Sequence, residues 1–140
     1  MKTFLKFLIV LILTFITNDN LLPFEPIPPG GDTLVMTLDC SKDYFASPFV
    51  LLPSAGDFVK FVAVNGRFSI LIRGANQFFE GVQDPLKIII DSNGNAESDT
   101  YTIISTLGVG SEIRCEVVCL TTGIIADVPP KIIIVPRNEQ

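Results

Sequence analysis

Three cysteines, Cys40, Cys115 and Cys119, are the residues of this sequence best suited to a covalent role. The last two lie in Glu-Ile-Arg-Cys-Glu-Val-Val-Cys-Leu, residues 112–120, where period-two alternation predicts a strand with both cysteines on its inward face. Along a strand these two residues stand roughly 13 Å apart, whereas a disulfide accepts at most about 7 Å between Cα atoms. A bridge from Cys40 to either Cys115 or Cys119 therefore stays open, and one thiol is left over.

Oxygen-bearing side chains recur in Asp91-Ser-Asn-Gly-Asn-Ala-Glu-Ser-Asp99, at positions 91, 93, 95, 97 and 99. Hard cations such as Ca²⁺ collect ligands of this kind. A calcium loop of the EF-hand type has Gly at its sixth position and Glu at its twelfth, where this sequence has Ala96 and Thr102. The pattern therefore favours a polar turn between two apolar strands, and we assign no metal ligand.

Catalysis is not expected, because the chain contains no histidine and so lacks the commonest general base and metal ligand. Glu112 and Glu116 alternate with Arg114 on the outward face of the strand at residues 112–120, which is typical of a solvated surface. The two cysteines of that strand point inward, away from any activating base. The sequence predicts a protein that is not an enzyme and carries no cofactor.

The N-terminal residues 1–20 have the pattern of an export signal. Lys2 and Lys6 precede an apolar run from Phe7 to Ile16, which is too short for the about 20 residues of a membrane-spanning helix. We expect a signal peptide and a secreted or extracytoplasmic protein. Retention of the segment as a short N-terminal anchor is the alternative, and it is the one case in which we expect contact with a membrane.

Residues 21–31 contain four prolines and end on two glycines, which predicts an extended arm with a flexible joint before a domain at residues 32–140. A chain of 140 residues with 48% hydrophobic and 18% charged residues fits one globular domain. The net charge of −5 and the absence of any basic cluster exclude nucleic acid as an expected partner.

The domain is expected to be all-β, with about seven strands. In the first, Leu34, Met36, Leu38 and Cys40 share the core face. Two Asn-Gly pairs, Asn65-Gly66 and Asn93-Gly94, have the chemistry of tight hairpin turns. Phe78-Phe79 is interpreted as a core plug rather than an exposed tip. The remaining strands are expected at residues 58–64, 67–73, 86–90, 100–104, 112–120 and 131–135.

Two segments, Leu-Val-Met-Thr-Leu-Asp-Cys40 and Glu-Ile-Arg-Cys-Glu-Val-Val118, resemble the B and F strands of an immunoglobulin-like domain, over residues 33–135. The resemblance implies a single antiparallel Greek-key sandwich, a Cys40–Cys115 disulfide and a closing G strand at residues 131–135. Cys119 would then be a buried free thiol or the partner of a cysteine in another chain. The sequence departs from the family in having no tryptophan, and Ile113 where a corner tyrosine stands.

Two functions without catalysis remain. In the first, the protein is a recognition module whose loops at one end of the sandwich bind another extracellular protein. In the second, it is a structural subunit of a fibre or multimer that donates an extended segment to the sheet edge of a neighbour. We predict the first, with self-association as a further expectation.

Overall fold

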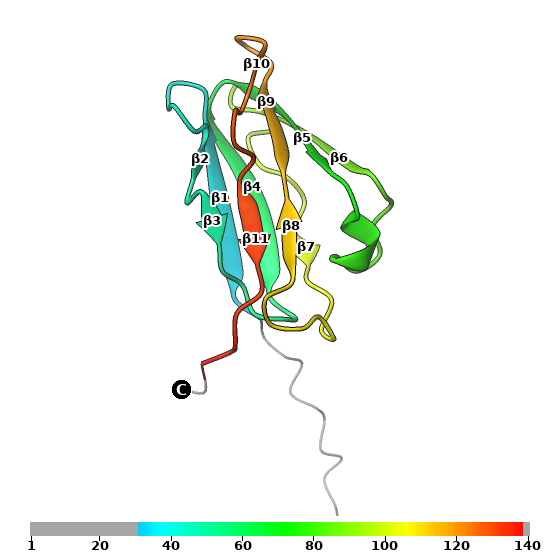
Figure 1. Ribbon diagram of the computed structural model, residues 1–140. Coiled ribbons are helices and arrows are strands. Elements are labelled where there is room, and N and C mark those ends of the chain that lie inside the picture. Colours follow the sequence, from blue (N-terminus) through cyan, green and yellow to red (C-terminus); the bar gives the residue numbers. More distant parts are fainter. Residues whose placement is uncertain (1–30, 139–140) are drawn as a thin grey trace, which may run out of the picture.

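The structure is a computed structural model that describes residues 31–138 (Figure 1). The predicted signal segment, nearly all of the predicted arm and residues 139–140 lie outside this part. Within the described range the chain forms eleven strands and one short 3₁₀ helix, η1 (Ala75–Gln77). No helix in that range is long and apolar enough to cross a membrane. The all-β class predicted from the sequence is confirmed.

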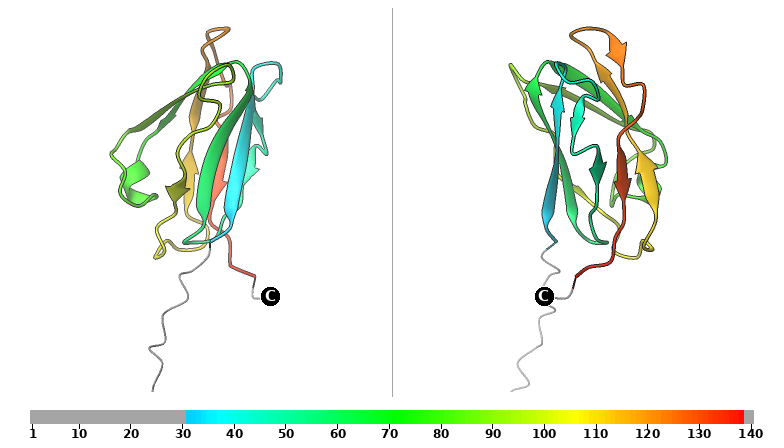
Figure 2. Two further views of the ribbon diagram at one scale, coloured as in Figure 1. Left: turned by 180° about the vertical axis from the view of Figure 1, so that it is seen from behind. Right: turned by 60° about the vertical axis from the view of Figure 1, so that its left-hand side comes forward.

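Two layers of strands face each other across the core (Figures 1 and 2). The first layer is one four-stranded sheet, in the order β2 (Ala46–Ser47), β1 (Thr33–Asp39), β4 (Phe58–Asn65) and β7 (Tyr101–Thr102). The second layer contains a sheet in the order β10 (Ile124–Ile125), β9 (Glu116–Cys119), β5 (Arg67–Ile72) and β6 (Leu86–Asp91), and a sheet in the order β3 (Val50–Leu51), β11 (Lys131–Ile133) and β8 (Glu112–Arg114). These two sheets form one layer because β8 runs into β9 through Cys115 alone.

The core consists of the inward faces of both layers, and alternation along the strands decides which residues enter it. Met36 and Leu38 of β1 are fully buried, as the period-two pattern predicts, and so are the three apolar residues at alternate positions of β5. The largest fully buried side chains are Phe61, Phe68, Phe79, Met36, Leu38, Ile70, Ile72, Ile90, Ile103, Ile132, Ile134 and Val59.

Phe78 and Phe79 form a core plug, as predicted. Both rings are buried and lie edge to face, with their centroids 5.3 Å apart. Phe79 also packs against Tyr101, with ring centroids 5.8 Å apart, and its backbone pairs with Ile103. The plug therefore attaches the loop after β5 to the first layer.

The sheets are not all antiparallel, and this part of the sequence prediction is wrong. β1 and β4 run parallel along their whole length, and β11 runs parallel to β3. The connection from β1 to β4 contains β2 and β3, so the chain returns to the starting end before β4 begins. A parallel pair needs such a long connection, and the local turn signals of the sequence give no sign of it.

Neither Asn-Gly pair joins two strands of a hairpin: Gly66 is a single bend residue between two strands, and Asn93-Gly94 lies in a turn closed by the Gly94 N–H on the Asp91 carbonyl. Gly66 alone separates β4 from β5, yet β4 pairs with β1 and β7 while β5 pairs with β6 and β9. After Asn93-Gly94 the chain likewise leaves the sheet of β6, and Glu97 pairs with Val62 of β4. Each turn carries the chain from one layer to the other. Of the four residues only Gly66 has a positive φ, so the predicted type I′ turn is wrong at both pairs, and so is the predicted pairing of the flanking strands.

The disulfide joins Cys40 to Cys119, with 5.8 Å between the Cα atoms, and it links the two layers. The Cys40–Cys115 bridge implied by the immunoglobulin resemblance is wrong. Cys40 directly follows the last residue of β1, and Cys119 ends β9 at the same end of the sandwich. Cys115 lies four residues earlier, roughly 13 Å further along the strand. A cysteine at the end of one strand requires a partner at the end of the opposing strand.

Gly66 lies directly against this disulfide. A Cβ atom at this position would stand 2.4 Å from Sγ of Cys40 and 3.1 Å from its Cβ, and the backbone φ of Gly66 is +97°. Any larger residue therefore meets both a steric clash and an unfavourable backbone conformation. The crossing between the layers and the disulfide depend on the same glycine.

We predict that Gly66→Ala destabilises the fold by about 2 kcal/mol or more, because the new methyl group meets Sγ of Cys40 and alanine disfavours a positive φ. Gly94→Ala is the matched control: Gly94 also follows an asparagine, but a Cβ atom there meets open space. Thermal unfolding and non-reducing peptide mapping give the comparison. Equal melting temperatures for the two variants would contradict the assignment.

Candidate functional site

The polar segment at residues 91–99 uses its oxygen atoms for local structure. The Asp91 carboxylate accepts the Asn93 N–H, at 2.9 Å. The Ser92 hydroxyl accepts the Gly66 N–H, and the buried Ser98 hydroxyl accepts the Phe61 N–H, both at 3.0 Å. Glu97 forms an ion pair with Lys60. These bonds fix the second crossing between the layers. Among residues 31–138 no group of three or more His, Cys, Asp or Glu side chains is placed so that it could hold a metal ion.

The acidic residues of β8 and β9 form ion pairs on the surface. Glu112 contacts Arg114 and Lys131, each with an oxygen–nitrogen distance of 3.3 Å, and Glu116 contacts Arg73 at 3.1 Å. The hydrogen bond from Lys131, and then that from Arg114, lower the pKa of Glu112 below its usual value. Exposed pairs of this kind contribute little to stability, so the solvated face predicted from the sequence describes them well.

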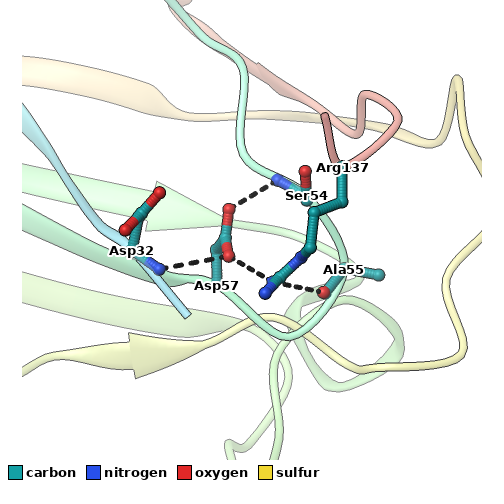
Figure 3. A network of polar contacts seen from close by, with 5 residues as sticks. All are labelled: Asp32, Ser54, Ala55, Asp57 and Arg137. Atoms are coloured by element: carbon teal, nitrogen blue, oxygen red, sulfur yellow. Dashed lines mark hydrogen bonds and ion pairs between the residues drawn. The ribbon is translucent and has the colours of Figure 1, made fainter. Parts of the chain in front are cut away.

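The buried carboxylate of Asp57 lies at the end of the sandwich that holds both ends of the described chain (Figure 1), and Figure 3 shows its contacts. Oδ1 of Asp57 accepts two hydrogen bonds, one from the Asp32 N–H at 3.2 Å and one from Nη2 of Arg137 at 2.6 Å. Oδ2 accepts a third from the Ser54 N–H at 2.8 Å. Arg137 also donates to the Ala55 carbonyl, at 3.2 Å. The group ties β1, the loop before β4 and the C-terminal segment together.

Gly31 makes the attachment of this end tight. A Cβ atom at Gly31 would lie 2.3 Å from the Gly56 carbonyl oxygen and 2.7 Å from Cα of Asp57. The flexible joint predicted at the two glycines is therefore not loose at Gly31. A hollow of about 510 Å³ lies beside the network, but the Asp57 oxygens already have partners. We interpret the network as a structural tie rather than a reactive site.

The free thiol is Cys115, not Cys119. It is fully buried between β8 and β9, and burial raises its pKa to about 12. A thiol in this state is a weak nucleophile at neutral pH and cannot reach a cysteine of another chain. The sequence prediction of one buried free thiol is right, but it named the wrong residue.

A largely apolar groove of about 430 Å³ lies on the outer face of the β10-β9-β5-β6 sheet. β5 contributes Ser69 and Leu71 to its floor, and β9 contributes Val118. The segment after β9 forms one wall, and charged side chains from β6 and β9 flank the floor. The complete lining is Ser69, Leu71, Lys87, Glu116, Val118, Ile125, Ala126 and Pro129.

The wall of this groove is a ridge formed by residues 124–129, here called the β10 ridge. Ile124 and Ile125 are both exposed although they occupy successive positions in a strand, so neither face of β10 is covered. Val128 of the ridge lines a second hollow of about 350 Å³ with Tyr44 and Phe49. The ridge therefore contributes apolar side chains to two separate hollows of the surface.

The hairpin that carries the ridge is fixed at its base. Cys119 pairs with Ile124, and Val118 with Ile125, while the disulfide holds Cys119 to the first layer. The hairpin lies at the opposite end of the sandwich from the Asp57 network (Figure 1). β10 was not predicted from the sequence, although Thr121-Thr122-Gly123 before two isoleucines is a turn signal followed by a short apolar strand.

No protein-family model matches this chain, and no curated protein matches it significantly. We therefore infer a function from the geometry of the surface.

We predict that Asp57→Asn lowers the free energy of unfolding by about 2 to 4 kcal/mol, since an amide cannot accept all three hydrogen bonds and leaves Arg137 without its counter-charge. Asp43→Asn, at an exposed position, is the control and should change stability little. Denaturant unfolding followed by circular dichroism measures both. A loss of less than about 0.5 kcal/mol for Asp57→Asn would show that the network is not a structural tie.

We expect the folded protein to contain one thiol that does not react with Ellman's reagent near pH 8, because Cys115 is buried and protonated. After unfolding in guanidinium without reductant, one thiol per chain should react. Peptide mapping of the labelled chain should place the label on Cys115. Rapid labelling of the native protein, or a label on Cys119, would contradict this arrangement.

Proposed function

We propose that this protein is a secreted or surface-exposed binding module that recognises another extracellular protein and performs no catalysis. The observation that carries the proposal is the β10 ridge with the groove beside it. Soluble proteins seldom leave large apolar side chains grouped on a rigid projection, unless these form a binding surface. Ile125 alone is 63% exposed at the edge of the groove.

The groove has the composition of a recognition surface. Its floor of Leu71 and Val118 supplies apolar area, while Lys87 and Glu116 at its margin supply one charge of each sign. Apolar contacts provide most of the affinity in such a site, and the flanking charges select and orient the partner. The floor belongs to paired strands, so little ordering is needed on binding.

The position of the ridge supports the same function. The Asp57 network ties both ends of the described chain at one end of the molecule, and the hairpin projects from the other. A module attached through either end would present the ridge outward. The disulfide is compatible with an oxidising compartment, which supports an extracytoplasmic location.

The proposal includes the immunoglobulin-like relationship and its Greek-key topology. A two-layer sandwich with a disulfide between the layers supports it, and so does the position of β11, which pairs with β8 near the end of the chain. The absence of catalysis is supported by the satisfied Asp57 carboxylate and the buried Cys115 thiol.

The test is selection of peptides from a displayed library against the purified chain. We expect selected peptides to be rich in large apolar residues and to compete with one another, because the groove accepts only a few side chains. Ile125→Lys should weaken their binding about tenfold or more, as expected for a central apolar contact.

Val109→Lys is the matched control, since Val109 is 65% exposed and lies in the loop before β8, away from the groove. It should leave the affinity unchanged. The proposal fails if no peptide is selected, or if the two substitutions have the same effect on those that are.

A further inference from the structure

The β6 strand has a long edge with no neighbouring strand in the described part of the chain. It spans six residues and pairs with β5 on one side. The other edge strands among residues 31–138 contain two residues, in β2, β3, β7 and β10, or three, in β8. Short edges offer few backbone groups to another chain, whereas a long edge is a template for strand pairing.

The ladder between β5 and β6 determines which backbone groups face outward. The Ser92 N–H donates to the Gly66 carbonyl, at 3.1 Å, just beyond the strand ends. In the antiparallel register this makes Phe68–Ile90 and Ile70–Ile88 the hydrogen-bonded pairs, because such pairs recur at every second residue.

Lys87 and Ile89 therefore direct their N–H and C=O groups away from β5. The other side of β5 agrees with this assignment: the Leu120 N–H donates to the Arg67 carbonyl, so the odd-numbered residues of β5 bond to β9.

The free edge is limited at both ends. Pro85, before β6, has no N–H to donate. At the other end the Asp91 N–H donates to the Asn95 carbonyl, and the Asp91 carbonyl accepts the Gly94 N–H, both at 3.0 Å. The edge therefore offers two donors and two acceptors, from Lys87 and Ile89.

We propose that β6 is a self-association surface, on which a second copy of the chain pairs its own β6 antiparallel. In the register that places Ile88 opposite Ile88 of the second copy, Lys87 lies opposite the second copy's Ile89. By symmetry, Ile89 lies opposite the second copy's Lys87. All four free groups of each strand then form hydrogen bonds. Pro85 lies opposite the second copy's Asp91, so neither end of the ladder leaves a donor unpaired.

The outward side chains fit this pairing. Ile89 is 42% exposed, and the aliphatic part of the second copy's Lys87 can cover it. Each Lys87 has the second copy's Asp91 on one diagonal and the second copy's Lys87 on the other, so its ammonium group turns toward the carboxylate. Ile88 and Ile90 stay buried in their own core. The pairing thus extends the second layer across two molecules without opening either one.

Sedimentation velocity of the full chain over a concentration series is the test. The wild-type chain should show a reversible monomer–dimer equilibrium. Ile89→Lys places like charges opposite each other twice in the dimer, and should weaken dimerisation about tenfold or more. Val35→Lys is the matched control: Val35 is 40% exposed, but β1 has neighbours on both edges, so dimerisation should be unchanged.

A charge-swapped variant guards against a folding defect. Lys87→Glu combined with Ile89→Lys places opposite charges across the two-fold axis and should restore the dimer that Ile89→Lys loses. A wild-type chain that stays monomeric at all concentrations would overturn the proposal. A dimer that Ile89→Lys leaves intact would also overturn it, whether or not Ile125→Lys disrupts that dimer.

Cross-linking tests the register. A mixture of Lys87→Cys and Ile89→Cys chains should form a disulfide-linked heterodimer on mild oxidation, because these positions face each other at about 5.5 Å between Cα atoms. Each variant alone should cross-link much less. Efficient cross-linking of Ile89→Cys with itself would contradict the register. The inference is independent of the proposed groove function, because the peptide assay depends on Ile125 and this one on Ile89.

Discussion

The two layers of the sandwich are held together where the chain crosses between them at Gly66. Its N–H and C=O groups bond to Ser92 at the end of β6, and the disulfide between Cys40 and Cys119 packs against its Cα. Arg67, the next residue, bonds to the segment after β9, with its carbonyl to Leu120 and its N–H to the Thr121 hydroxyl. The ends of five strands therefore meet around one residue that has no side chain.

This junction also explains why the exposed hairpin can be rigid. A projecting hairpin with a two-residue edge strand would have little stability of its own. Here Cys119 ends the strand at the base of the hairpin and is covalently attached to the opposite layer, and Thr121 bonds to Arg67. A rigid surface loses less conformational entropy on binding. The disulfide thus contributes to the presentation of Ile124 and Ile125 as well as to the stability of the sandwich.

The sequence was sufficient for features that depend on local patterns. Alternation identified the core face of β1, and Phe78-Phe79 was correctly placed in the core. Prediction from the sequence failed for features that depend on which strands pair with each other. An Asn-Gly pair favours a change in chain direction, but such a change fits a hairpin within one sheet as well as a crossing between two layers. The cysteine pairing failed for the same reason, since alternation gives the face of a residue but not its height along the opposing strand.

The groove and the free edge belong to one sheet, and β5 connects them. Its even-numbered residues bond to β6 and its odd-numbered residues to β9, so it is fixed on both sides. Ser69 and Leu71 on its outer face form the floor of the groove, while its bonds to β6 hold Ile89 at the edge. Lys87 lines the groove and also lies opposite Ile89 in the proposed dimer. A dimer built on β6 would therefore place two grooves on one continuous sheet, related by a two-fold axis.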